Sequence, residues 1–400
     1  MNHKSQTLWL KPIPHSISFN PRLKSWVSNT KLNTALAEAK TISIMYKYSF
    51  VFLLSIFTKS VFAQSADNLL LKNYRPVSIY KTPTANIQRA SFPVIDMHSH
   101  DYVETKNDVD NLVKLMDKMN VRKTIILTYN TGKGFDSAVE KYNKYPGRFE
   151  LFCGFDYTGY GTPGWQKHAV EELERCYKEG AKGVGELGDK GEGELYSKPT
   201  PGKGLHIDDP QLKPLLEKCA ELHMPISIHV AEDEWMYETP DSTNDGMMNA
   251  ATWHVDMNKP NKLGHDALQK SLENAVRENP KTIFIACHLM NACSNLQVLG
   301  DMLDKYPNLY ADIAARFGEI APVPRYAAAF ITKYQDRLVY GTDNSPDEHM
   351  YLTTFRILET ADEHFYEQDT FNYHWALYGL DLPKEVLEKL YYKNAEKIMK

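Results

Sequence analysis

The sequence predicts an α/β fold, a closed (β/α)8 TIM barrel, and three observations support this prediction. From Val94 onward, short apolar runs alternate with amphipathic stretches, which is typical of βα units that build a parallel sheet. Eight such runs follow one another, in a chain whose length suits this barrel. Ionisable residues end several of the runs. We therefore expect the functional site at the C-terminal face of the strands, where the βα loops of a barrel converge.

The first half of the barrel is expected to contain four strands. They cover residues 94–100, 123–129, 149–157 and 181–188. A helix over residues 107–119 follows the first strand, because the apolar residues there recur at helical spacing. A second helix, over residues 166–179, stops before Gly180, a residue that commonly ends helices.

The second half repeats this pattern with longer connections. Its strands are expected at residues 225–232, 282–288, 309–314 and 338–343. A loop rich in glycine and proline runs to Ile207, and Asp208 or Asp209 caps a helix that ends at His223. A long insertion reaches from the fifth strand to Leu263. Helical segments then continue to the C-terminus.

Four segments are expected along the chain. Residues 1–44 have no coherent pattern and are interpreted as an overcalled or disordered extension, with Met45 as the true start. Residues 45–63 combine a basic start, an apolar core and small residues before the next segment, which is the layout of a secretory signal peptide. Residues 64–92 form an N-terminal arm, and residues 93–400 form the barrel.

The signal peptide predicts an exported protein, periplasmic or extracellular, that is cleaved after Ala63. The apolar core is shorter than the roughly 20 residues that a helix needs to span a bilayer, so no stable membrane insertion is expected after cleavage. The competing interpretation is a membrane-anchored protein with a basic cytoplasmic tail.

Charge and cysteine content exclude some classes of protein. The net charge is −5, although the first 63 residues carry eight Lys or Arg and one acid, so the remaining chain is more acidic still. An acidic body argues against nucleic-acid binding, which needs a basic surface. The five cysteines are scattered and form no Cys-x-x-Cys, so neither a disulfide framework nor a thiolate zinc site is indicated.

The histidines at the strand ends point to a metal site. His98 and His100 are two residues apart in the first strand, so both imidazoles should face the same side. Neutral imidazoles are good ligands for a divalent metal such as Zn²⁺. His229, His288 and Asp343 end the fifth, sixth and eighth strands, which should bring them to the same face.

These residues resemble the amidohydrolase superfamily, over roughly Val94 to the end of the chain. The resemblance is carried by Asp96-x-His98-x-His100, by His229 and His288, and by Gly341-Thr342-Asp343. It implies that His98, His100, His229 and Asp343 bind one or two divalent ions, Zn²⁺ in the first place. In binuclear members His288 would be a ligand too, and in mononuclear ones it would face the substrate. The most similar group is the amidohydrolase-related one, which includes decarboxylases, hydratases and lactone hydrolases.

Two positions depart from the family pattern. Glu186 stands on the fourth strand, where the family often has a carboxylated lysine. This glutamate could bridge two ions, or it could orient a ligand histidine from outside the metal shell. The surrounding Gly183–Gly188 is similar to the strand-four motif of TatD-type nucleases, although the acidic body and the signal peptide argue against that activity. The sixth strand ends in Cys287-His288-Leu289-Met290 rather than His-Gly-Gly.

The expected function is hydrolysis of a small-molecule ester, lactone or amide by hydroxide on the metal. Asp343 would take the proton of the water, and His288 or the metal would stabilise the oxyanion. Arg316, just after the seventh strand, is the candidate for holding a substrate carboxylate. Trp235 and Trp253 in the insertion are candidates for an aromatic lid over the substrate.

Two alternatives stay open. The first is a metal-dependent non-oxidative decarboxylase of a small carboxylic acid, in which the metal holds the acid group of the substrate. The second is a periplasmic binding protein that has kept the barrel without catalysis. The substrate, the number of metal ions and the oligomeric state do not follow from the sequence, although a homo-oligomer is compatible with it.

Overall fold

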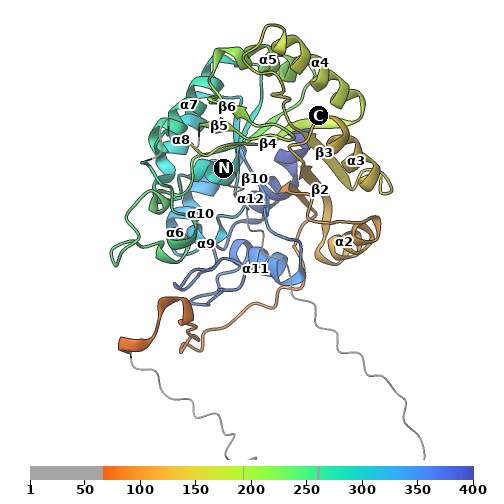
Figure 1. Ribbon diagram of the computed structural model, residues 1–400. Helices are drawn as coiled ribbons and strands as arrows, with labels where there is room; N and C mark the ends of the chain where they lie inside the picture. Colours follow the sequence, from red (N-terminus) through yellow and green to blue (C-terminus); the bar gives the residue numbers. More distant parts are fainter. Residues whose placement is uncertain (1–65, 192, 259–261) are drawn as a thin grey trace, which may run out of the picture. The chain divides into compact units, whose positions relative to one another are not determined.

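The computed structural model describes residues 66–191, 193–258 and 262–400 (Figure 1). The chain divides into two units, Met1–Leu69 and Leu70–Lys400, and the second contains all the elements that build the candidate site. The predicted signal peptide of residues 45–63 lies outside the described residues. No helix among the described residues is long and apolar enough to cross a membrane.

Eight parallel strands form one sheet in the order β1-β2-β3-β4-β7-β8-β9-β10. Their bounds are Val94–Ser99 (β1), Val121–Leu127 (β2), Phe149–Cys153 (β3), Ala181–Asp189 (β4), Ile226–Val230 (β7), Phe284–Ala286 (β8), Leu309–Asp312 (β9) and Leu338–Val339 (β10). The backbone N–H of Met97 donates to Tyr340 O at 2.9 Å, and that of Asp343 donates to His98 O at 2.8 Å. These bonds join the last strand to the first, so the predicted eight-stranded barrel is confirmed.

Helices surround the strands (Figure 1). Their bounds are Lys106–Met119 (α2), Gly132–Tyr142 (α3), Trp165–Lys178 (α4), Lys213–Glu221 (α5), Met247–Trp253 (α6), His265–Glu278 (α7), Leu296–Lys305 (α8), Phe317–Ile320 (α9), Pro324–Lys333 (α10), Glu348–Glu359 (α11), Lys384–Glu388 (α12) and Asn394–Ile398 (α13). Shorter helical turns are Ala66–Asn68 (η1), Leu71–Asn73 (η2), Pro210–Leu212 (η3), Glu234–Met236 (η4), Cys287–Asn291 (η5), Cys293–Asn295 (η6) and Lys389–Lys393 (η7). A small hairpin, Glu194–Leu195 (β5) and Gly202–Lys203 (β6), interrupts the loop after β4.

Helix ends follow local sequence signals. Helix α2 begins with a capping box in which Thr105 and Asp108 each satisfy a backbone N–H of the other, and it ends at Asn120 in the left-handed conformation. The helix predicted to run to His223 is found as two pieces, η3, which begins at Pro210, and α5, which has Pro214 in its first turn and ends at Glu221. Asp209 caps η3. Of the two predicted capping residues, Asp208 and Asp209, the cap is therefore Asp209.

The core has two layers. Ile95, Ile125, Ile285 and Val339 belong to a cluster formed inside the ring of strands, and Ile398 of α13 packs with them. A larger cluster lies between the strands and the surrounding helices. The C-terminal helix therefore helps to fill the barrel interior.

The strands end earlier than predicted at several positions on the site face. The sixth strand was expected to reach His288, but β8 ends at Ala286, and residues 288–291 all have φ between 51° and 60°. The eighth was expected to reach Asp343, but β10 ends at Val339 and Asp343 has φ of 48°. Left-handed residues cannot continue a β ladder, and each costs roughly 1–2 kcal/mol. Such strained residues often lie at functional sites.

Candidate metal centre

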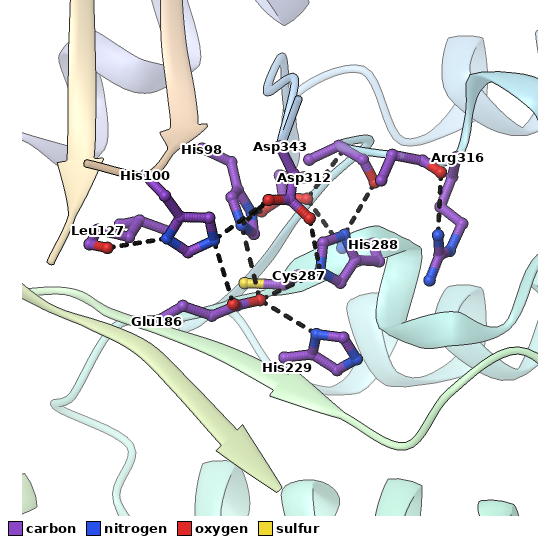
Figure 2. Close-up of polar contacts among 12 residues, drawn as sticks. His98, His100, Leu127, Glu186, His229, Cys287, His288, Asp312, Arg316 and Asp343 are labelled. Carbon is purple, nitrogen blue, oxygen red and sulfur yellow. Dashed lines mark hydrogen bonds and ion pairs between the residues drawn. The ribbon is translucent and has the colours of Figure 1, made fainter. Parts of the chain in front are cut away.

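The structure brings together all six residues predicted as metal ligands, at the C-terminal face of the barrel (Figure 2). They are His98 and His100 at the end of β1, Glu186 on β4, His229 on β7, His288 after β8 and Asp343 after β10. All are buried or half-buried.

Glu186 occupies the middle of the group and faces four histidines (Figure 2). Its Oε1 lies 3.6 Å from His98 Nε2, 3.2 Å from His229 Nδ1 and 3.1 Å from His288 Nε2. Its Oε2 lies 3.5 Å from His100 Nε2. One carboxylate on β4 thus connects histidines at the ends of three other strands, β1, β7 and β8.

Asp343 faces three of the same histidines. Its Oδ1 lies 3.1 Å from His100 Nε2 and 3.7 Å from His98 Nε2, and its Oδ2 lies 3.8 Å from His288 Nε2. The hydroxyl of Tyr102 donates to Asp343 Oδ1 at 3.1 Å. The carboxylate therefore has a fixed position beside the histidines.

Three histidines are oriented through their other ring nitrogen. His98 Nδ1 lies 2.9 Å from Asp312 Oδ2, while the Nδ1 of His100 and that of His288 donate to Leu127 O and Ala314 O at 2.9 Å. Such contacts set the tautomer and direct each Nε2 towards the centre. His98 Nε2 is buried and has no hydrogen-bond partner among the described residues.

The carboxylates and the histidines of the group shift one another's pKa values. Burial alone would lower the pKa of His98, but Asp312, Asp343 and Glu186 outweigh it and raise that pKa to about 9. Burial opposes ionisation of Glu186 and Asp343, yet His98 and His100 hold the pKa of both carboxyls below the ordinary range. Burial and the nearby His229 lower the pKa of His288. The two carboxylates are thus stabilised by positive charge, which a divalent ion would also supply.

The donor set fits a divalent metal ion. Three groups have ligand atoms that lie within 4.8 Å of one another, namely His98 with His288 and Asp312, His98 with His100 and Glu186, and Glu186 with His229 and His288. Imidazole nitrogen and carboxylate oxygen are ligands that zinc-type ions accept. The buried, unpartnered His98 Nε2 is a ready ligand atom. Two of the groups share Glu186.

Several polar residues near the site were missed by the sequence analysis. Asp312 ends β9 and contacts His98, and its Oδ1 also accepts from the backbone N–H of His288 at 2.8 Å. Tyr102 follows β1, Lys190 follows β4, and Glu232 lies two residues after β7. Each stands at or just after a strand end, so the rule that singled out the histidines could have found them.

Asp96 belongs to the same motif as His98 and His100, but its contacts are with Thr342 and Tyr351 rather than with the metal-ligand cluster. Its carboxylate accepts hydrogen bonds from the backbone N–H of Thr342 at 3.0 Å, from the Thr342 hydroxyl at 2.7 Å and from Tyr351 of α11 at 3.4 Å. It belongs to none of the ligand groups among the described residues. Asp96 ties the first strand to the last and so fixes the distance between His98 and Asp343.

A cavity of about 370 Å³ opens on the cluster. Its lining includes His229, His288, Asp343, Lys190, Glu232, Asp233, Arg316, Glu319, Met236, Trp253, Phe371 and Tyr373. Lys190 Nζ lies 2.7 Å from Glu232 Oε1, and the lysine side chain is 46% exposed. Burial would lower the pKa of Lys190, but Glu232 and the cluster carboxylates raise it above the ordinary value.

The three predicted substrate residues have different surroundings. Trp253 lines the cavity, as does Arg316. The Arg316 guanidinium is buried, donates to Asn291 Oδ1, and lies 3.3 Å from Asp233 and 3.6 Å from Glu319. Trp235 is not among the described residues that line this cavity; it packs against Tyr373 and Trp375. Substrate contacts of all three stay predictions.

Solved structures with a similar fold include enzymes of several kinds. A 5-carboxyvanillate decarboxylase from Novosphingobium aromaticivorans is 14% identical, with 77% of this chain and 96% of that chain covered and a TM-score of 0.47. A 4-oxalomesaconate hydratase from Rhodopseudomonas palustris is 14% identical, with coverage of 76% and 95% and a TM-score of 0.45. An amidohydrolase from Burkholderia multivorans is 10% identical, with coverage of 77% and 99% and a TM-score of 0.46.

Comparison with protein families gives a firmer result. No curated protein matches the chain. The family model described as amidohydrolase (Amidohydro_2) matches residues 157–400, which is more than half of the sequence and includes Glu186, His229, His288 and Asp343. The resemblance inferred from the strand-end histidines is thereby confirmed, and the chain belongs to the amidohydrolase family of metal-dependent enzymes.

Proposed function

We propose that this protein hydrolyses a small-molecule ester, lactone or amide with the help of two divalent metal ions, zinc in the first place. The observation that carries the proposal is the position of Glu186, which belongs to two overlapping ligand groups. A carboxylate shared in this way suits a bridge between two ions. Divalent ions held there would suit hydrolysis, because such ions can activate water and polarise a carbonyl.

The ligands proposed are His98, His100, His229, His288 and Asp343 together with the bridging Glu186. Ions held there would lower the pKa of a bound water from about 15.7 towards 7. Asp343 keeps its charge and is held by Tyr102, so it is placed to take a proton from water and return it to the leaving group. The proton thus passes from water to the alcohol or amine that departs, and the acyl carbon gains the hydroxyl.

Lys190 is proposed to bind an acidic group of the substrate. Its side chain is half-exposed and contacts one carboxylate, whereas the buried Arg316 already contacts both Asp233 and Glu319. An incoming anion therefore meets less competition at Lys190 than at Arg316. The aromatic rings of Trp253, Phe371 and Tyr373 would pack against the body of the same molecule.

A metal-dependent non-oxidative decarboxylase is the second candidate, and Lys190 is the observation that favours it. A lysine beside the cluster could hold the carboxylate that leaves as CO₂, in a cavity whose aromatic lining suits an aromatic or unsaturated acid. Decarboxylation breaks the bond to the carboxylate, which leaves as CO₂, and the same carbon takes a proton, so a proton donor is needed as well. Asp343 or His288 would have to carry that proton, because both line the cavity.

The two reactions are separated by their products. The purified protein, freed of metal by a chelator and reloaded with Zn²⁺ or Mn²⁺, is offered a panel of lactones and esters in a proton-release assay and a panel of aromatic acids in a CO₂-release assay. Metal-dependent proton release from a lactone or ester, abolished in His98→Ala, is the expected result. Metal-dependent CO₂ release without hydrolysis would replace the first proposal by the second.

A paired substitution tests Lys190 within either reaction. Lys190→Met should raise KM for substrates with a carboxylate by about tenfold or more, and Lys190→Arg should restore part of the loss because it keeps the charge. A neutral ester of the same shape should show no such difference. If both variants leave KM for the acidic substrate unchanged, Lys190 does not bind the substrate.

A further inference from the structure

A second cavity, of about 460 Å³, lies next to the one that opens on the metal cluster. The two share Glu319 in their linings. Three carboxylates from the loop after β7, those of Glu234, Glu238 and Asp245, line the second cavity, and all three residues are exposed. Within the described ranges, no Lys or Arg lines it, and no ion pair neutralises these three acids. The cavity therefore attracts positive charge.

Aromatic rings form another part of the lining. Trp235, Tyr326 and Trp375 all contribute to it. The ring of Trp375 is stacked on that of Tyr373, with centroids 4.1 Å apart and planes at 16°, and Trp235 meets Trp375 at 6.3 Å and 67°. Trp375 is further held by a 3.0 Å hydrogen bond from its Nε1 to Gly318 O. These supported rings offer faces to a cation.

Two polar atoms of the lining residues are buried and have no hydrogen-bond partner among the described residues, namely Trp235 Nε1 and Glu319 Oε2. Glu319 is 8% exposed, and its Oε1 accepts a 2.6 Å hydrogen bond from Tyr373. Its Oε2 has no hydrogen-bond partner in the part of the chain that the structure describes. A buried carboxyl oxygen without a partner is costly, so a ligand that donates a hydrogen bond would be favoured there.

We propose that this second cavity binds a primary organic ammonium ion. Glu319 releases its proton to solvent when the cation binds, and the N–H groups of the ammonium then donate to Glu319 Oε2. The charge of the ammonium is balanced by Glu234, Glu238 and Asp245, and its carbon skeleton packs against Trp235 and Trp375. A neutral ligand would leave the three carboxylates unmatched, and an anion would be repelled by them. The inference does not depend on which reaction the metal cluster catalyses.

Benzylammonium and benzyl alcohol form a matched pair of probes, because they have nearly the same shape and differ in charge. Isothermal titration calorimetry on the full chain, with tryptophan fluorescence recorded alongside, should show one site for benzylammonium with an affinity at least about tenfold above that for benzyl alcohol, or about 1.4 kcal/mol. The affinity should fall as salt is added, since the three carboxylates are exposed. Equal affinity of the two probes would overturn the proposal.

Two triple variants locate the site. Glu234→Gln/Glu238→Gln/Asp245→Asn should lose about tenfold or more in affinity for benzylammonium. Glu171→Gln/Glu217→Gln/Glu278→Gln removes the same number of exposed charges from other helices and should bind as the parent does. Thermal melting checks that both remain folded. An equal loss of affinity in the two triple variants would mean that benzylammonium responds only to the net charge of the protein. An unchanged affinity in Glu234→Gln/Glu238→Gln/Asp245→Asn would mean that benzylammonium binds elsewhere, for instance in the cavity at the metal cluster. Either result would overturn the proposal.

Discussion

At the scale of single residues, Glu186 has the widest influence, because four histidines lie within 3.6 Å of its two oxygens. We expect elemental analysis to find about two metal ions per chain and about one in Glu186→Gln, since an amide cannot bridge two cations as a carboxylate does. Hydrolytic activity should fall about a hundredfold or more.

The control for this prediction is Glu367→Gln, which changes a buried glutamate that contacts His349 and belongs to none of the ligand groups among the described residues. Its metal content should equal that of the parent. A parent with one ion that survives in Glu186→Gln would contradict the bridge and favour the decarboxylase.

Glu319 gives a prediction about pH and stability. Burial raises the pKa of this carboxyl from 4.5 to about 8 although Arg316 opposes the shift, so the folded protein keeps a proton that the unfolded chain releases. Stability from this residue is therefore complete below about pH 4.5 and is lost as the pH rises towards 8. Glu319→Gln cannot ionise, so its stability relative to the parent should increase by roughly 1–3 kcal/mol between pH 5 and pH 8.

Thermal or urea unfolding at the two pH values measures this difference. The exposed Glu217→Gln, which changes the same residue type on the surface of α5, is the control and should follow the parent at both pH values. A constant difference between Glu319→Gln and the parent across this range would show that Glu319 is ionised in the folded protein.

At the scale of elements, the turn η5 after β8 determines where His288 lies. Four consecutive residues, 288–291, are left-handed, and Asn291 holds the turn in place. Its Nδ2 donates to Val230 O at 3.0 Å and to Ala231 O at 3.2 Å, and its Oδ1 accepts from Arg316. The side chain of one residue thus joins β7, the turn and the buried arginine.

Replacing Asn291 by Ala should destabilise the protein by roughly 2–4 kcal/mol, because buried carbonyls and part of the Arg316 guanidinium lose their partners. Alanine also accepts the left-handed conformation less readily than asparagine. Chemical unfolding measures the loss, and activity should fall with it because His288 loses its support. Asn295→Ala, an exposed neighbour in η6, should change stability by less than about 0.5 kcal/mol; a similar loss in both variants would argue against a special role for the turn.

At the scale of the whole molecule, the chain is proposed to be exported. Residues 45–63 have the layout of a signal peptide, so the mature protein from a secreting host should begin at Gln64. N-terminal sequencing of the secreted protein measures this directly. An Ala63→Leu variant, which removes the small residue before the cleavage site, should accumulate as a longer precursor, whereas Ala85→Leu, in the mature chain, should be processed normally. A cytoplasmic, full-length product in the parent would contradict the proposal.

Much of the fold could be predicted because its signals are local. Helix α2 was predicted at residues 107–119 and is found at Lys106–Met119, since its capping residues and apolar spacing are contained in one stretch of sequence. The ends of β8 and β10 were placed too late. There the chain is held in left-handed conformations by contacts with other strands, such as those of Asn291 with β7, which local propensity does not contain.

The candidate site, like the fold, has some features that could be predicted from the sequence and others that could not. The sequence by itself determined that the chain is a (β/α)8 barrel of amidohydrolase type and which histidines and carboxylates end its strands, because alternation along a strand and the order of βα units are properties of the chain. Only the tertiary structure decided that Glu186 meets four histidines, that Asp312 orients His98, and that Arg316 is enclosed by Asp233 and Glu319. Except for Arg316 and Glu319, which are neighbours in sequence, those contacts join residues far apart in sequence, and their distances depend on how the ring of strands closes.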